Sequence, residues 1–303
     1  MAASIQTPLG PAAYNTVFNI GCPQTATIKV IEQFQDWKLL ASVMVCEYCS
    51  NHICWMSSTS NTSTNRRHKF VDGYFWKCFE ITCPRIYCRT SIRSGSFFER
   101  SRLTLKCWLH IFFHFSMETS ISKTANVLGL RKWTICTAFT TLREYVSNYI
   151  TESTITLGGI GKHIEIDEYF LGTHICVFAQ VDASVTPKVG SMQVVERRHI
   201  DVILPIIHAT CLPGSLILND AWPGYRKISQ ELGFEHQIVN PVCGANTDAM
   251  QSYWAKHKAI FKKIKFLPQQ DHQMHLNEAM FRERTLGKFF EALLDVIASE
   301  HTL

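Results

Sequence analysis

The sequence predicts an α/β fold in which a mixed sheet is flanked by helices and preceded by a cysteine-rich and a helical segment. Residues 160–262 contain short Val-, Ile- and Leu-rich runs, three in succession and then alternating with helical runs, which is typical of a mixed sheet with flanking helices. Six of the twelve cysteines lie in residues 42–98. Residues 101–150 have helical periodicity, interrupted at Gly129.

The composition favours a folded intracellular protein of about two domains for its 303 residues. Hydrophobic residues make up 46% and charged residues 18%, which argues against a disordered chain. A net charge of +5 is compatible with DNA binding. The N-terminus has no basic and apolar signal pattern, and the most apolar run, Cys107–Phe115, is too short to span a bilayer. We therefore expect no membrane association, a nuclear or cytoplasmic location, and cysteines that act as thiols or metal ligands.

Four segments follow in chain order: an N-terminal arm with a short helix (1–40), the cysteine-rich segment (41–98), the helical segment (99–150) and the α/β domain (158–303). The arm's helix is predicted from the apolar spacing of Ile28, Ile31, Phe34 and Leu39. Within the α/β domain, strands are predicted at His163–Tyr169, Thr173–Val181, Gly190–Glu196, Ser215–Asn219 and His236–Asn240. Helices are predicted at Asp201–Thr210, Gly224–Leu232, Thr247–Lys263 and around Phe289–Ile297.

The cysteine-rich segment contains two closely spaced pairs that suit zinc. Cys46 and Cys49 are separated by two residues, and Cys78 and Cys83 by four. A structural Zn²⁺ ion takes four ligands, usually from two such pairs, in a tetrahedral arrangement. The segment has too little core to fold alone, so the metal would hold it together. A set of buried free cysteines is the alternative. Cys54 and Cys88 are spare thiols that could replace a ligand in the site.

The helical segment has the pattern of a helix-turn-helix. A short helix begins at Ile121, Gly129 provides the turn, and the next helix opens with basic residues. Residues at the start of a recognition helix meet base edges and phosphates. The candidate DNA contacts are Lys123, Arg131 and Lys132; a plain helical hairpin used for packing or dimerisation is the alternative.

Two apolar strands in the α/β domain end in carboxylates. Asp167 and Glu168 close the first strand, and alternation places them on opposite faces. Asp220 follows the Ser215–Asn219 strand. Two carboxylates brought together can hold Mg²⁺ or Mn²⁺, and a two-metal site can cleave phosphodiesters. Strand-end caps with no joint role are the alternative.

Successive blocks of the chain resemble the Merlin-type transposases, which are related to bacterial insertion-sequence transposases of the ISXO type. The similar region includes the cysteine pairs, the run from Ser91 to Phe98 and the helical segment, and continues to the C-terminus. Its C-terminal blocks are Ile164-Glu-Ile-Asp-Glu168, Pro213-Gly-Ser-Leu-Ile-Leu-Asn-Asp-Ala-Trp222, Gly224-Tyr225, Gly233-Phe-Glu-His236, Val239-Asn240 and Asn246-Thr-Asp-Ala-Met-Gln-Ser-Tyr-Trp254 with Lys258.

This resemblance implies an RNase H-like fold with a site of three acidic residues, the DDE site, that acts with Mg²⁺ or Mn²⁺. Asp167 would lie on the first strand and Asp220 at the end of the fourth, and the third position, on a later helix, is Gln251. A glutamine lacks the anionic oxygen that hard cations prefer. Asp248, three residues earlier, is a possible substitute. Lys258 and Lys262 on the same predicted helix could hold DNA backbone or simply face solvent.

The first functional hypothesis is a transposase that binds double-stranded DNA at the terminal repeats of its element and performs strand cleavage and transfer. A homo-oligomer is compatible with this hypothesis. The second is a catalytically dead, recruited copy that binds DNA without cutting it; Gln251 and the short segments that border the site favour this hypothesis. The third is an interaction protein that uses the zinc ribbon.

Overall fold

The computed structural model describes residues 27–50, 54–58, 70–153, 155–172, 175–220, 222–239 and 248–301. These residues form two compact units: the first contains the described residues up to Leu142 together with those from Gly287 onward, and the second is Arg143–Leu286. The part of the predicted N-terminal arm before Thr27 and the resemblance blocks within residues 240–247 lie outside the described residues.

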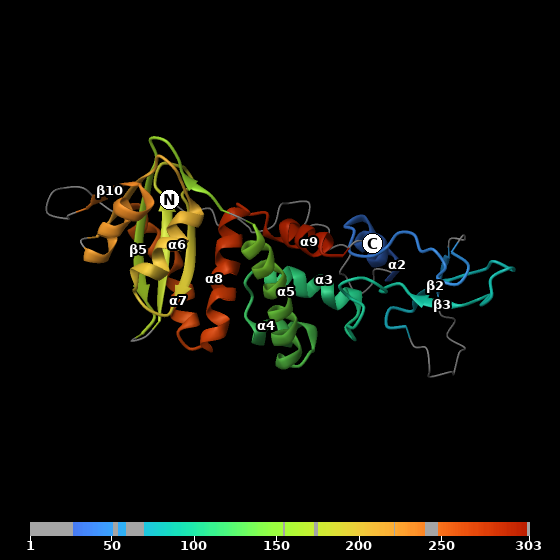
Figure 1. Ribbon diagram of the computed structural model, residues 1–303. Helices are drawn as coiled ribbons and strands as arrows, with labels where there is room; N and C mark the ends of the chain where they lie inside the picture. The colour runs from blue at the N-terminus through green and yellow to red at the C-terminus, as the bar shows by residue number, and fades with distance from the viewer. Residues whose placement is uncertain are drawn as a thin grey trace. The chain divides into compact units, whose positions relative to one another are not determined.

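The second unit is built on a five-stranded mixed sheet (Figure 1), which confirms the predicted α/β class. The order across the sheet is β10-β9-β5-β6-β7. β5 pairs with β6 and β6 with β7 in antiparallel fashion, while β9 lies parallel to both β5 and β10. The strands are β5 (His163–Phe170), β6 (Cys176–Asp182), β7 (Val189–Val195), β9 (Leu216–Asn219) and β10 (Glu235–Ile238).

Alternation along β5 divides its side chains between two different environments. Ile164 and Ile166 belong to a buried apolar cluster with helix α6 (Ile200–Thr210). Glu165 accepts a hydrogen bond from the backbone N–H of Met250 in helix α7 (Asp248–Ile264), so it points to the other face. Adjacent residues on β5 therefore face α6 and α7 in turn, as the period of a strand requires.

Helix α8 (Gln269–Arg284) completes the cover of the sheet and contacts β7 and α7. The sequence did not predict this helix. The segment predicted as one helix over Gly224–Leu232 is instead a short 3-10 helix, η2 (Pro223–Arg226), and a π-helical turn, η3 (Ile228–Leu232). A two-stranded parallel sheet pairs β4 (Leu157–Gly158) with β8 (Cys211–Leu212) beside the main sheet.

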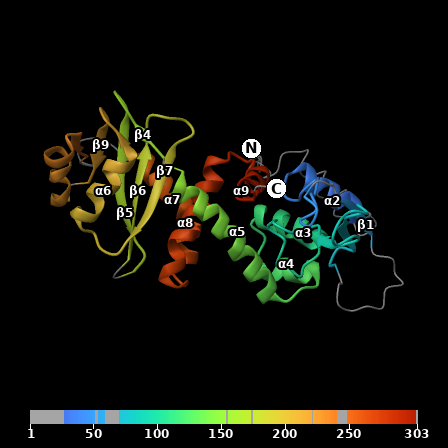
Figure 2. The same cartoon turned by 45° about the vertical axis from the view of Figure 1, so that its right-hand side comes forward.

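Among the described residues, the first unit contains four whole helices and the first part of α5 (Lys132–Glu152), and aromatic side chains pack between them. Figure 2 shows the ribbon of these elements. Phe34 contacts both Phe98 and Phe112, with ring centroids 5.0 and 6.2 Å apart. Phe115 contacts Phe289, with ring centroids 5.7 Å apart. The helices are α2 (Thr27–Asp36), α3 (Leu105–Ser116), α4 (Ile121–Leu128) and α9 (Phe289–Ser299).

The C-terminal helix α9 therefore belongs to a different unit from the one predicted for it, because the predicted α/β domain extended to residue 303. The apolar face of α9 is buried within the first unit, where Phe289 meets Phe115 and Phe290 meets Trp37. The division at the other end falls between Leu142 and Arg143, inside helix α5 (Lys132–Glu152). Domain limits placed at residues 150 and 158 thus differ from the limits of the compact units.

The cysteine-rich segment forms a three-stranded antiparallel sheet, β1-β2-β3. Its strands are β1 (Trp55–Ser58), β2 (Tyr74–Lys77) and β3 (Arg89–Ser91). Among the described residues, no helix has both the length and the apolar character needed to cross a membrane.

Candidate functional site

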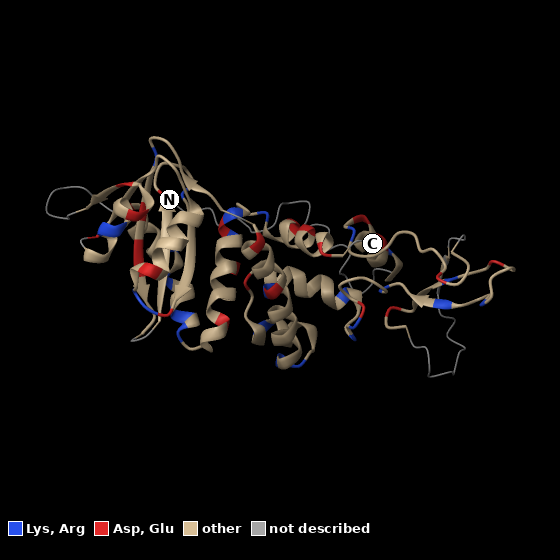
Figure 3. Ribbon diagram, viewed as in Figure 1, with Lys and Arg blue, Asp and Glu red and all other residues tan. Residues whose placement is uncertain are grey.

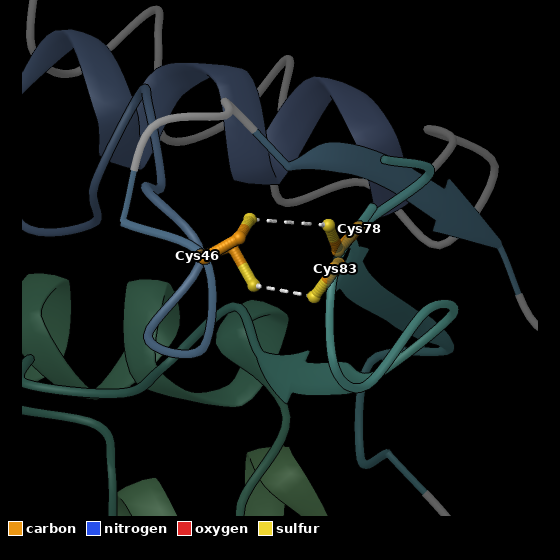
Figure 4. A group of neighbouring side chains, drawn as sticks. Cys46, Cys78 and Cys83 are labelled. Atoms are coloured by element: carbon orange, nitrogen blue, oxygen red, sulfur yellow. Dashed lines mark hydrogen bonds between the residues drawn. The ribbon is translucent and has the colours of Figure 1, made fainter. Parts of the chain in front are cut away.

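Four cysteines converge at the ends of the small β1-β2-β3 sheet (Figure 4). The sulfur atoms of Cys46, Cys49, Cys78 and Cys83 all lie within 4.8 Å of one another. Cys46 and Cys49 precede β1, Cys78 directly follows β2, and Cys83 lies in the turn that leads to β3. We call these four residues the cysteine cluster; the structure brings together the four cysteines that the two sequence pairs predicted.

The geometry of the cysteine cluster fits a tetrahedral metal ion. Cys46 and Cys83 have their sulfurs 3.8 Å apart, and Cys49 and Cys78 have theirs 3.9 Å apart. A Zn–S bond of about 2.3 Å in tetrahedral geometry separates neighbouring sulfurs by about 3.8 Å. Three of the four residues are buried and Cys49 is half-buried. The cluster could therefore bind a metal such as zinc.

The pKa values of the thiols differ within the cysteine cluster. Burial raises the pKa of Cys83. Burial alone would raise the pKa of Cys46, but backbone N–H groups of Tyr48 and Cys49 and neighbouring thiols outweigh it, and lower the pKa to about 6. Burial and the charge of neighbouring thiols raise the pKa of Cys54 to about 12. Thiolates are the form that binds metal. Cys88 is a fifth nearby thiol, with its sulfur 3.7 Å from that of Cys46.

Asp220 directly follows β9, as predicted, but Asp167 and Glu168 do not close β5: they lie within it, paired with β6, and the strand continues to Phe170. Asp167 faces α7 and accepts a hydrogen bond from the Trp254 indole at 2.9 Å. Burial raises the pKa of Asp167, the Trp254 hydrogen bond lowers it in part, and the charge of Asp220 raises it. Asp167 and Asp220 therefore interact electrostatically. Glu168 points away from Asp167, as the alternation predicted, and accepts a hydrogen bond from the Tyr225 hydroxyl.

Arg198, which follows β7, contacts two of these acidic residues. Its Nη2 atom lies 2.9 Å from Glu168 Oε2 and 3.1 Å from Asp220 Oδ2. The contact with Glu168 is an ion pair whose angles do not meet those of a hydrogen bond. The guanidinium lies over the Trp222 ring, 4.5 Å from its centroid. We call Asp167, Glu168, Asp220 and Arg198 the carboxylate site. Sequence reasoning missed Arg198 because an arginine after a strand matches no motif.

The remaining candidates for the DDE site lie on α7. Asp248 is the first residue of that helix and Gln251 follows one turn later; both are exposed. Within the described part of the chain, the cysteine cluster is the only group of three or more His, Cys, Asp or Glu residues whose ligand atoms all lie within 4.8 Å of one another. Asp167, Glu168 and Asp220 do not form such a group among the described residues.

The predicted DNA contacts of the helical segment lie on the surface. Figure 3 colours the Lys and Arg positions of the ribbon blue. Ser120 caps α4 through its side chain, which accepts a hydrogen bond from the Lys123 backbone N–H. Gly129 ends that helix at φ 64°, the left-handed conformation that favours glycine. Lys123, Arg131, Lys132 and Trp133 are exposed, the last at 79%. No acidic residue occurs between Glu118 and Glu144, so this stretch carries only positive formal charge.

The predicted basic residues of α7, Lys258 and Lys262, are exposed as well. Lys256 on the same helix is engaged, because its Nζ atom lies 2.6 Å from Glu283 Oε1. Lys258 and Lys262 are therefore accessible on α7. Their exposure is compatible both with a helix face that simply contacts solvent and with contacts to the DNA backbone.

No family model matches this chain. No curated protein matches it either. Among solved structures, the chain is similar to one chain in a cryo-EM structure of the simian T-cell lymphotropic virus intasome in complex with PP2A regulatory subunit B56 gamma, with 12% identity and a TM-score of 0.32. That similarity covers 55% of this chain and 66% of that chain, just under two thirds of its length. A TM-score this low carries no argument about fold or function.

Proposed function

We propose that Arg143–Leu286 is an RNase H-like domain of Merlin-type transposase descent. Asp167 lies on β5, the first strand of the five-stranded sheet in chain order, and Asp220 directly follows β9, the fourth. Gln251 lies on a later helix. These positions are the ones that the sequence resemblance implies for the nuclease site, and they support this proposal.

The function that we propose for the chain is DNA binding through α4 and the start of α5, with zinc holding the preceding cysteine-rich segment folded. The observation that carries this proposal is the exposed basic surface made by Lys123, Arg131 and Lys132, with no acidic residue nearby in the sequence. Basic side chains bind DNA by neutralising phosphates and releasing counterions. The exposed Trp133 ring adds an apolar surface of the kind that can contact thymine methyl groups.

The test is binding of the zinc-loaded chain to a generic DNA duplex over a range of salt concentrations. We expect affinity to fall steeply with salt, because the binding energy comes largely from phosphate contacts. The triple substitution Lys123→Ala/Arg131→Ala/Lys132→Ala should reduce the slope of log affinity against log salt by about 3, roughly one for each lost phosphate contact.

A matched control removes the same charge elsewhere in the first unit. Lys29, Arg100 and Arg102 are exposed outside α4 and α5, and their triple alanine variant should leave the slope nearly unchanged. Equal effects of the two triple variants would refute the assignment to α4 and α5. Absence of salt-dependent binding, together with self-association that Trp133→Ala abolishes, would instead favour the helical hairpin as a dimerisation surface.

Strand cleavage is the second candidate function, and we expect it to be absent from the chain as it stands. With Mg²⁺ or Mn²⁺, nicking of a supercoiled plasmid should not exceed that of Asp220→Ala. Gln251→Glu alone should not restore cleavage, because Arg198 still pairs with Asp220 at 3.1 Å. Cleavage by the unmodified chain that is lost in Asp220→Ala would reveal a working nuclease and make Asp248 the candidate third ligand.

A further inference from the structure

The carboxylate site already contains a cation, the guanidinium of Arg198. Arg198 lies in the short connection between β7 and α6, while Glu168 and Asp220 come from β5 and the end of β9. Three separate parts of the unit thus converge on one charged group. A surface ion pair formed by chance would not be expected to join three elements in this way.

Asp220 uses both of its carboxylate oxygens within this arrangement. Arg198 Nη2 lies 3.2 Å from Asp220 Oδ1 and 3.1 Å from Oδ2. The backbone N–H of Trp222 also donates to Oδ1, at 3.1 Å. A divalent ion would need at least one of these oxygens as an anionic ligand. The carboxylate of Asp220 is therefore already satisfied by groups of this chain.

Burial and aromatic stacking strengthen the interaction between the Arg198 guanidinium and the carboxylates. The side chain of Glu168 is 1% exposed and that of Arg198 is 25% exposed, whereas that of Asp220 is 53% exposed, so the partly buried pair is the one with Glu168. Arginine is more weakly hydrated than an ammonium ion and stacks well on aromatic rings, and here the Trp222 ring lies beneath it. Charge pairs in partly buried surroundings interact more strongly than pairs in water. Removing Arg198 would leave Glu168 buried without its cation.

We infer that Arg198 is the resident cation of the carboxylate site and that it excludes a divalent metal ion from Asp220. A guanidinium placed between Glu168 and Asp220 neutralises the charge that would attract the ion and repels the ion directly. This inference rests on the proposed function in one respect: it takes the carboxylate site to descend from the nuclease site of a transposase. The metal binding that it predicts can be measured without DNA.

The experiment is a titration of the zinc-loaded full chain with Mn²⁺, with bound and free ion distinguished by electron paramagnetic resonance. We expect the unmodified chain to bind Mn²⁺ weakly. Arg198→Ala should bind it at least about tenfold more tightly, because a positive charge a few ångströms from the ion has been removed. Adding Asp220→Asn to Arg198→Ala should abolish that gain.

Arg197→Ala is the matched control, because it removes a neighbouring exposed arginine with the same charge. It should leave Mn²⁺ affinity within about twofold of the unmodified chain, since its charge is screened by solvent. Circular dichroism establishes that each variant is folded. An Arg198→Ala chain that folds but binds Mn²⁺ no more tightly would overturn the inference.

A second measurement keeps the inference testable even where Arg198→Ala does not fold. Submillimolar Mn²⁺ binding by the unmodified chain that is lost in Asp220→Asn would show that Arg198 does not exclude the ion, and would also overturn the inference. Neither result depends on DNA affinity, so failure of this inference and failure of the proposed DNA binding are distinguishable.

Discussion

Replacing Cys78 with serine is expected to abolish metal binding by the cysteine cluster and to unfold the β1-β2-β3 sheet. Cys78 directly follows β2, and its sulfur lies 3.9 Å from that of Cys49. Serine cannot supply the soft thiolate that zinc prefers. Treatment of the unmodified chain with a strong chelator should have the same effect.

The expected effect is large because the strands are short, although a buried ion pair between Arg93 and Asp72 at 2.6 Å also lies in this segment. Its strands contain four, four and three residues. Phe75 and Trp76 on β2 and Ile92 just after β3 are among its few buried apolar side chains. Structural zinc sites contribute about 10–16 kcal/mol of apparent binding free energy that is also folding free energy. A segment of this size loses its fold when that contribution is removed.

Zinc content by atomic emission and amide hydrogen exchange of β2 together test this prediction. Cys88→Ser is the matched control, because Cys88 lies in the same segment but outside the group of four; it should retain one zinc ion and the protection of β2. Cys107→Ser, in helix α3, should do the same. A Cys78→Ser chain with full zinc content and a protected β2 would contradict the assignment of the cluster.

Replacing Glu278 with glutamine is expected to destabilise the second unit by about 3–5 kcal/mol, as measured for buried ion pairs that lose one partner. Glu278 on α8 lies 2.6 Å from Arg143 Nε and 2.7 Å from Arg282 Nη2. Its side chain is 10% exposed and that of Arg143 is 9% exposed. The substitution would leave Arg143 buried without its counter-charge.

The same carboxylate should make the second unit sensitive to acid. Burial by itself would raise the pKa of Glu278, but the guanidiniums of Arg282 and Arg143 outweigh it and lower the pKa to about 2. In the unfolded chain the pKa is about 4.3. Because the folded pKa is the lower one, the stabilisation is fully present above the unfolded pKa and is lost as the pH falls toward 2.

Urea denaturation of the unmodified chain and of Glu278→Gln, at neutral pH and at a series of lower pH values, measures both effects. Glu231→Gln is the control, since Glu231 forms an exposed pair with Lys227 at 3.5 Å. Exposed pairs contribute about 1 kcal/mol or less. Equal stability of Glu278→Gln and Glu231→Gln would show that the buried pair contributes nothing beyond a surface one.

The missing prediction of α8 has a specific physical cause. Its buried residues include His272, His275, Asn277 and Glu278. Helix prediction from sequence depends on apolar residues recurring on one face, and these polar residues obscure that pattern. Two of them are paired with another helix: the Arg143 guanidinium of α5 contacts Glu278, and Ser147 of α5 accepts a hydrogen bond from Asn277.

The sequence by itself determined the strands, the cysteine pairs and the position of Asp220 after its strand, because each is a local pattern of alternation or spacing, whereas the end of β5 falls two residues beyond Glu168. The five predicted strands of the α/β domain all occur, with limits shifted by up to three residues. The four predicted zinc ligands come together because each pair is close in the chain, and the antiparallel sheet brings one pair to the other.

Only the tertiary structure decided what surrounds those carboxylates. Asp167 and Glu168 are adjacent in sequence, yet one meets Trp254 and the other meets Arg198 and Tyr225. Arg198 is 22 residues from Asp220 in the chain, and no local pattern links them. Their contact depends on strand order and on the path of the connection into α6, and these arise only when the sheet assembles.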